Sequence, residues 1–139
     1  MVGSTRARGD TTQPDLTDSN EVFISGPRVL SAALDSALNR ANRASANMRL
    51  NYKFDTTASE FFYPRTDAGP FMERRIPVIE FFTGMHDRYH GPADEARFLD
   101  PRKMEAVART VLATIWMVAD SPARPTADKG WPGMVPRYP

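Results

Sequence analysis

The chain has 139 residues, with 18 Lys and Arg against 17 Asp and Glu, and it contains no cysteine. This length suits one modest domain with a buried core. A formal net charge of +1 gives no basic surface for nucleic acid or an anionic membrane, and the missing cysteines exclude disulfides, Cys zinc sites and thiol catalysis. No apolar run is long enough to span a membrane, and residues 1–10 lack the apolar stretch of a signal peptide.

The first half of the chain predicts a strand, a helix and a second strand. Residues 21–25 form a short apolar run ended by a Gly-Pro pair, which favours a buried strand. Apolar residues recur at helical spacing from Leu30 to Ala41, and Ser31 is placed to cap that helix. Residues 50–54 alternate apolar and polar, which predicts a strand with one exposed face.

The second half predicts a short helix over 67–74, a strand over 76–82 and a long final helix capped by Asp100. The near-continuous hydrophobicity of 76–82 indicates burial on both faces, as in a parallel or mixed sheet covered by helices. The final helix is expected to turn one apolar stripe to the core, made of Met104, Val107, Ala108, Val111, Leu112, Ile115, Val118 and Ala119. The opposite, exposed face is expected to carry Arg102, Lys103, Arg109 and Thr110.

The order of these elements predicts an α/β layer structure with about three strands and flanking helices. So small a sheet leaves exposed edges, which indicates that part of the fold is missing. Residues 122–139 are rich in proline, which neither continues a helix nor joins the centre of a sheet. We interpret them as an extended or disordered tail, with Trp131 as its anchor.

The loop after the strand 76–82 carries the chain's two histidines, His86 and His90. Catalytic loops of open α/β sheets lie at the carboxyl ends of strands, where Asp94 is also near enough in sequence to orient an imidazole. The residues alone leave two readings open, because a single His in a loop is more often structural than a metal ligand. The four-residue spacing would suit zinc on a helix, but the surrounding Gly and Pro residues disfavour a helix here.

The same loop resembles a motif of the zinc aminopeptidases related to bacterial leucyl aminopeptidase, glutamate carboxypeptidase and glutaminyl cyclase, which form clan MH. In that family an Ile-Pro-Val strand precedes a His and then Tyr-His-x-Pro-x-Asp. The chain matches with Ile76-Pro77-Val78, His86, Tyr89-His90, Pro92 and Asp94, and it has Arg75 where the family has Gly. Upstream, Arg65-Thr66-Asp67-Ala68 resembles the family's Arg-Ser-Asp-His, with Ala68 replacing the His.

The resemblance implies that His90 is a zinc ligand. It also implies that Thr66 and Asp94 support this ligand by hydrogen bonds, and that Tyr89 and Asp67 line the site. The remaining ligands of the family's two zinc ions, and its general-base Glu, would precede Met1. Glu21, Glu60 and Glu73 are isolated in sequence and are interpreted as surface carboxylates, so no residue of this chain is expected to be catalytic.

Residues 1–121 are therefore expected to form the C-terminal portion of a mixed-sheet, three-layer zinc-exopeptidase fold, followed by the tail. The implied function is that of a C-terminal fragment of a zinc metallo-aminopeptidase. The intact enzyme would release N-terminal residues from peptides, whereas this fragment would be inactive and bind zinc weakly. The alternatives are a subunit of a split enzyme, whose partner is the missing N-terminal half, and a non-catalytic binding or scaffold module. By resemblance alone, the expected location is periplasmic or secreted.

Overall fold

The computed structural model describes residues 2–7, 10–56 and 66–129. In chain order, the elements are β1 (Glu21–Ser25), α1 (Pro27–Leu30), α2 (Ala32–Ala44), β2 (Arg49–Asn51), α3 (Gly69–Met72), β3 (Glu80–Phe82), the 3-10 helix η1 (Ala96–Phe98) and α4 (Pro101–Ala119). The strands form one mixed sheet in the order β2-β1-β3, with β1 parallel to β2 and antiparallel to β3. The predicted α/β class, with a three-stranded mixed sheet and flanking helices, is confirmed.

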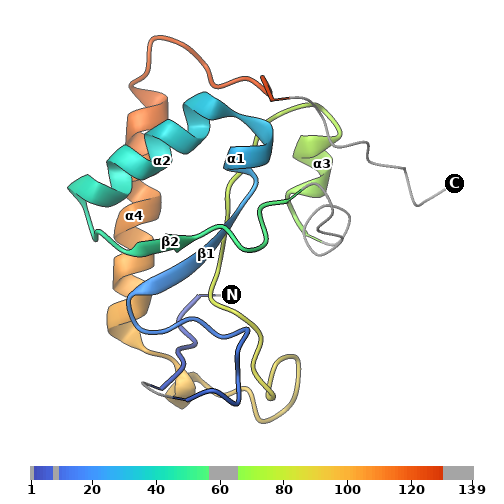
Figure 1. The fold of residues 1–139 in the computed structure, drawn as a ribbon, viewed down its shortest axis with the longest axis vertical. Coiled ribbons are helices and arrows are strands. Elements are labelled where there is room, and N and C mark those ends of the chain that lie inside the picture. Colours follow the sequence, from blue (N-terminus) through green and yellow to red (C-terminus); the bar gives the residue numbers. More distant parts are fainter. Residues whose placement is uncertain (1, 8–9, 57–65, 130–139) are drawn as a thin grey trace, which may run out of the picture.

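The two faces of the central strand β1 pack differently, because successive side chains of a strand point to opposite faces. Val22 and Ile24 are fully buried in the core that α2 and α4 share with the sheet. Figure 1 shows these two helices crossing beside the strands. Phe23 faces the other way, and its ring centroid lies 4.8 Å from that of Phe54 and 6.3 Å from that of Phe82. The main core therefore lies between the sheet and the α2–α4 pair.

Helix α2 begins where the sequence predicted. The hydroxyl of Ser31 accepts a hydrogen bond from the amide of Leu34 at 3.4 Å, which satisfies one of the free amides of the first turn. The predicted apolar stripe is buried at Leu34, Ala37, Leu38 and Ala41, whereas Ala33, which the same pattern included, is exposed. The amphipathic pattern of this segment was therefore sufficient to orient the helix.

A buried amide fixes the path from α2 to β2. Asn42 donates from Nδ2 to the carbonyl of Met48 at 2.8 Å, and its Oδ1 accepts from the amide of Met48 at 2.9 Å. We expect Asn42→Ala to lower the free energy of unfolding by about 2–3 kcal/mol, because two buried backbone groups lose their partners. Urea unfolding measures this loss, and Arg43→Ala at the exposed neighbouring position should change it by less than about 0.5 kcal/mol. Equal losses in the two variants would contradict this role.

Strand β3 is shorter and less buried than predicted. It comprises three residues instead of seven, and every residue from 76 to 82 is only half-buried. The prediction of burial on both faces is therefore wrong for the described chain. Within the described residues, β3 is an edge strand that pairs with β1 alone, and Pro77 cannot donate a ladder hydrogen bond. The strand predicted over 50–54 is likewise shorter and shifted, at Arg49–Asn51.

Helix α4 begins as predicted, because the carboxylate of Asp100 accepts from the amides of Arg102 and Lys103 at 3.0 and 3.3 Å. The face that it turns to the core differs from the prediction. Its buried residues are Lys103, Val107, Thr110 and Thr114. Of the predicted core stripe, Met104, Ala108, Leu112, Ile115 and Ala119 are exposed instead.

The polar residues on the buried face of α4 are satisfied, which explains why this face can be buried. The hydroxyl of Thr110 donates to the carbonyl of Ala106 at 3.0 Å, and that of Thr114 donates to the carbonyl of Thr110 at 2.7 Å. Threonine commonly bonds in this way to the preceding turn of its own helix. The hydroxyl of Thr110 also lies 3.4 Å from Oδ1 of Asn42 on α2, so this contact between the two helices is partly polar.

Lys103 ties α4 to the N-terminal segment. Its side chain is 1% exposed, and Nζ donates to the carbonyl of Ser4 at 2.7 Å, the carbonyl of Thr17 at 3.2 Å and the hydroxyl of Thr17 at 2.7 Å. An ammonium group has three donors, so each one finds an acceptor. These three hydrogen bonds offset part of the cost of burying the charge.

The described part of the tail returns to the start of α2. The amide of Lys129 donates to the carbonyl of Leu30 at 3.4 Å, and the carboxylate of Asp128 accepts from the amide of Ala32 at 2.9 Å. Residues 121–129 contain no helix or strand, and Trp131, the predicted anchor, lies outside the described residues. None of the described helices combines the length and apolar character needed to cross a bilayer.

Candidate functional site

The loop that carries His90 is anchored where it leaves β3. The amide of Thr17 donates to the carbonyl of Thr83 at 2.9 Å, and Gly84 forms an isolated β-bridge with Leu16. Gly84 has φ of 106°, and a Cβ atom there would lie 2.0 Å from the carbonyl oxygen of Asp15. Only glycine allows both this backbone conformation and this close approach. The entrance of the loop is therefore fixed against residues 15–17.

His86 and Asp94 close the loop. Nε2 of His86 lies 3.6 Å from Oδ1 of Asp94, and two turns between them are closed by backbone hydrogen bonds from Tyr89 to His86 and from Asp94 to Gly91, at 2.9 and 3.1 Å. The side chain of His86 is 5% exposed, and its Nδ1 has no hydrogen-bond partner among the described residues. Asp94 thus lies beside His86, and we infer that it shapes the loop through this residue.

His90 is the exposed imidazole of the loop. Its φ of 58° lies in the left-handed region, which residues other than glycine seldom adopt. Its ring centroid lies 3.9 Å from that of Tyr89, with the planes tilted by 32°. The amide of Gly91 donates to the carbonyl of Arg88 at 2.9 Å, so His90 is the third residue of a tight turn, a position where type II turns require positive φ.

Thr66 and Asp67 lie beside Glu80, the first residue of β3. Burial raises the pKa of the Glu80 carboxyl, the neighbouring charge of Asp67 raises it further, and a hydrogen bond from Thr66 opposes both effects. Glu80 was not among the residues predicted for the site. A usable signal was present, because Glu80 is the one charged residue within the apolar run 76–82. The structure therefore pairs Thr66 and Asp67 with a half-buried carboxylate.

Glu21, Glu60 and Glu73 were interpreted as surface carboxylates, and this interpretation is wrong for Glu21. It is 6% exposed, forms an ion pair with Arg49 at 3.1 Å and accepts a hydrogen bond from Asn51 at 2.8 Å. Burial acts to raise the pKa of Glu21, but the contacts with Arg49 and Asn51 outweigh it and hold the pKa below the usual value. Strand pairing of β1 with β2 brings these partners together. Glu73 is exposed, as expected, and Glu60 lies outside the described residues.

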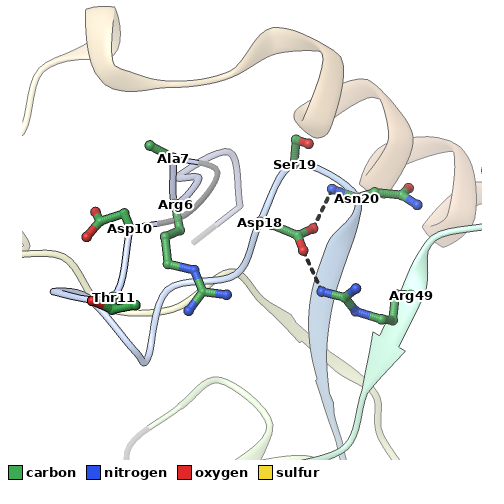
Figure 2. A pocket seen from close by; sticks show the side chains of 8 residues that line it. All are labelled: Arg6, Ala7, Asp10, Thr11, Asp18, Ser19, Asn20 and Arg49. Carbon is green, nitrogen blue, oxygen red and sulfur yellow. Dashed lines mark hydrogen bonds and ion pairs between the residues drawn. The ribbon is translucent and has the colours of Figure 1, made fainter.

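A pocket of about 530 Å³ lies at the N-terminal segment, where the sequence predicted no site. Its lining is formed by Arg6, Ala7, Asp10, Thr11, Asp18, Ser19, Asn20 and Arg49 (Figure 2). The carboxylate of Asp18 already bonds to Arg49 and to the amide of Asn20. Two Arg and two Asp balance the charge, and none of the predicted site residues lines this pocket. It therefore provides no support for the metal site or for an anion site.

The described residues do not form a zinc site by themselves. Structural zinc sites use four protein ligands and catalytic zinc sites use three. Among residues 2–7, 10–56 and 66–129, no group of three or more His, Asp or Glu side chains could hold a metal ion. These residues alone therefore do not complete a zinc site around His90.

Comparison with known families extends beyond the loop to most of the chain. The sequence model of peptidase family M28 matches residues 15–115. This range includes the whole sheet, the loop with His86, His90 and Asp94, and much of α4. Neither the curated proteins nor the solved structures contain a match. Because the family model covers well over half of the sequence, the chain belongs to peptidase family M28.

Proposed function

We propose that this chain is the C-terminal part of a zinc aminopeptidase and that His90 supplies one ligand of its metal centre. Membership of family M28 supports a metallopeptidase class, because this family depends on zinc. The observation that carries the proposal for this chain is the exposed position of His90 in an anchored loop of the family motif. His90 is an exposed imidazole at φ of 58°, in a loop anchored at Gly84 and closed by His86 and Asp94.

The other predicted site residues have distinct proposed roles. Tyr89 stacks on the imidazole at 3.9 Å and restricts its rotation. Asp94 acts on the loop through the buried His86, at 3.6 Å. Thr66 and Asp67 are proposed to line the substrate side of the site, next to Glu80. Peptides are the proposed substrate of the complete enzyme.

We propose that the chain alone has no peptidase activity, since its described residues provide no set of three metal ligands. A subunit of a split enzyme is the second candidate, and the edge position of β3 favours it. Within the described residues one side of β3 has no partner strand, and such an edge can accept a strand from another polypeptide. A non-catalytic module would share the fold but would gain no activity from any partner.

A complementation experiment tests this proposal. The purified chain is mixed with the separately expressed N-terminal half of an M28 aminopeptidase catalytic domain. The zinc content of the mixture and its rate of leucine p-nitroanilide hydrolysis are then measured. We expect background activity for the chain alone and zinc-dependent activity for the mixture. His90→Ala should lower the activity of the mixture by at least about 100-fold, because a metal ligand is lost.

The matched control is Asp87→Ala, which removes an exposed charge from the same loop and should leave activity within about twofold. An active mixture that is indifferent to His90→Ala would show that His90 is not a ligand. A complex that forms without gaining zinc or activity would instead support the non-catalytic module. Hydrolysis by the chain alone, removed by a chelator, would contradict the proposed dependence on missing ligands.

A further inference from the structure

Helix α4 carries an apolar face that is left uncovered by the described residues. Leu112, Ile115 and Trp116 are 64%, 60% and 72% exposed. Together with the exposed side chains of Met104, Ala108 and Ala119, they are called the α4 face below. Figure 1 shows α4 along one edge of the molecule, with α2 crossing it. A contiguous apolar surface of this kind usually marks an interaction site.

The spacing of the α4 face indicates that its partner is another helix. Ala108, Leu112, Ile115 and Ala119 follow one another at intervals of four, three and four residues. This alternation is the seam of two helices that pack at a shallow angle, with side chains of one helix fitting between those of the other. The seam lies opposite the face that buries Val107 against the body of the protein.

Two charged residues at the ends of α4 indicate the orientation of the partner. Arg102 is exposed in the first turn, and Asp120 is exposed at the C-cap. Each lies at the end of the helix dipole that disfavours its charge, because anions are stabilised at a helix N-terminus and cations at a C-terminus. Neither side chain forms an ion pair with another described residue. Their charges would both be stabilised beside an antiparallel copy of the same helix.

Arg102 and Asp120 also lie on one flank of the seam. They are 18 residues apart, which is about five helical turns at 3.6 residues per turn. A twofold axis beside Val111, perpendicular to the helix and lying in the interface, reverses the helix direction but keeps this flank on the same side. It therefore brings Arg102 of each copy to the level of Asp120 of the other.

We propose that the α4 face binds the α4 face of a second copy of this chain, as an antiparallel helix pair. Leu112, Ile115 and Trp116 of both copies would form its apolar centre. An Arg102–Asp120 pair would close each end, and the twofold symmetry gives a closed dimer. This pairing is independent of zinc and of the proposed role of His90.

Analytical ultracentrifugation of the full-length chain between about 1 and 200 µM tests the pairing. We expect a monomer at the lowest concentration and mostly dimer at the highest, because one helix pair buries less than a standard protein interface. In a Trp131→Phe background, the emission of Trp116 should shift to shorter wavelength over the same range. Leu112→Asp should weaken dimerisation by at least about 100-fold, because it buries a charge at the centre of the seam.

A charge exchange tests the orientation without altering the apolar centre. Arg102→Asp and Asp120→Arg should each weaken the dimer by roughly tenfold, because each places like charges together. The double variant should restore the original affinity. The charge exchange therefore still tests dimerisation if Leu112→Asp unfolds, as a loss of helical circular dichroism would show. A chain that stays monomeric at about 200 µM, or a dimer unaffected by Leu112→Asp in a folded variant, would overturn the proposal. A double variant no better than the single variants would overturn the antiparallel arrangement.

Discussion

Replacing Gly84 by alanine is expected to lower the free energy of unfolding by at least about 3 kcal/mol. The added Cβ would lie 2.0 Å from the carbonyl oxygen of Asp15 and 2.6 Å from Cα of Leu16, both backbone atoms that cannot move independently. At φ of 106°, a side chain is also strained whatever the available space. Urea unfolding measures the loss, and a variant of unchanged stability would contradict the close approach of these two segments.

Gly91→Ala is the matched control within the same loop. There the nearest backbone atom is the carbonyl oxygen of Arg88, at 3.1 Å from the added Cβ, and φ is not in the positive region. This substitution should cost less than about 1 kcal/mol. A large loss for Gly84→Ala and a small one for Gly91→Ala would show that the loop depends on its anchor at residues 15–17 rather than on glycine content.

The second large effect is a rise in stability with pH caused by Lys103. Burial lowers the pKa of Lys103 to about 8 from a usual value of 10.5, although nearby carboxylates, with Asp18 first, act in the opposite direction. Between pH 8 and 10.5 the unfolded chain therefore binds a proton that the folded chain has released. The free energy of unfolding should rise with pH across this window, by up to about 3 kcal/mol. Below pH 8 both states are protonated, and Lys103 contributes no slope.

Urea unfolding at a series of pH values from 7 to about 11 measures this rise. Lys103→Met should remove it, whereas Lys129→Met, at an exposed lysine, should retain it. Above pH 10 the rise should weaken, because burial raises the pKa of Tyr52 to about 12. The unfolded chain then loses the Tyr52 proton while the folded chain keeps it, which lowers the free energy of unfolding as pH increases. An equal rise in the parent chain and in Lys103→Met would show that Lys103 is not its source.

The parts of the fold that the sequence predicted well are those governed by local signals. The strand at residues 21–25 is a short apolar run ended by a Gly-Pro pair, and the structure has β1 over the same residues. The caps Ser31 and Asp100 bond to amides only a few residues away, so they depend little on the rest of the molecule. The orientation of α2 also followed from its local pattern, because four of its apolar residues at helical spacing, Leu34, Ala37, Leu38 and Ala41, are buried.

The face that α4 turns to the core depended on distant partners, and local pattern could not reveal them. Lys103 is buried because Ser4 and Thr17 supply three oxygen acceptors, and these residues are far away in the sequence. Likewise, the burial of β3 depends on how many strands flank it, which its own apolar sequence does not specify. In both cases the segment is apolar, as the sequence indicates, but its burial depends on which other elements pack against it.

For the candidate site, the motif located the loop but not its internal contacts. Tyr89, His90 and Asp94 were named from the resemblance, and the structure places the rings of Tyr89 and His90 together. It assigns Asp94 to His86, and Thr66 to the unexpected Glu80. These pairings arise from turn geometry and from the position of β3. The assignment of His90 as a metal ligand remains a prediction, for which complementation is the direct test.

The tie between Ser4 and Lys103 also limits the order in which the chain can fold. The two residues are 99 positions apart, whereas β1 and β2 are joined by contacts spanning about 30 residues through α2. Contacts between distant residues close slowly, because a long loop must first lose its freedom. During synthesis from the N-terminus, β1, α2 and β2 emerge well before α4. The segment around Ser4 is therefore made before α4 but reaches its final position only once α4 is present.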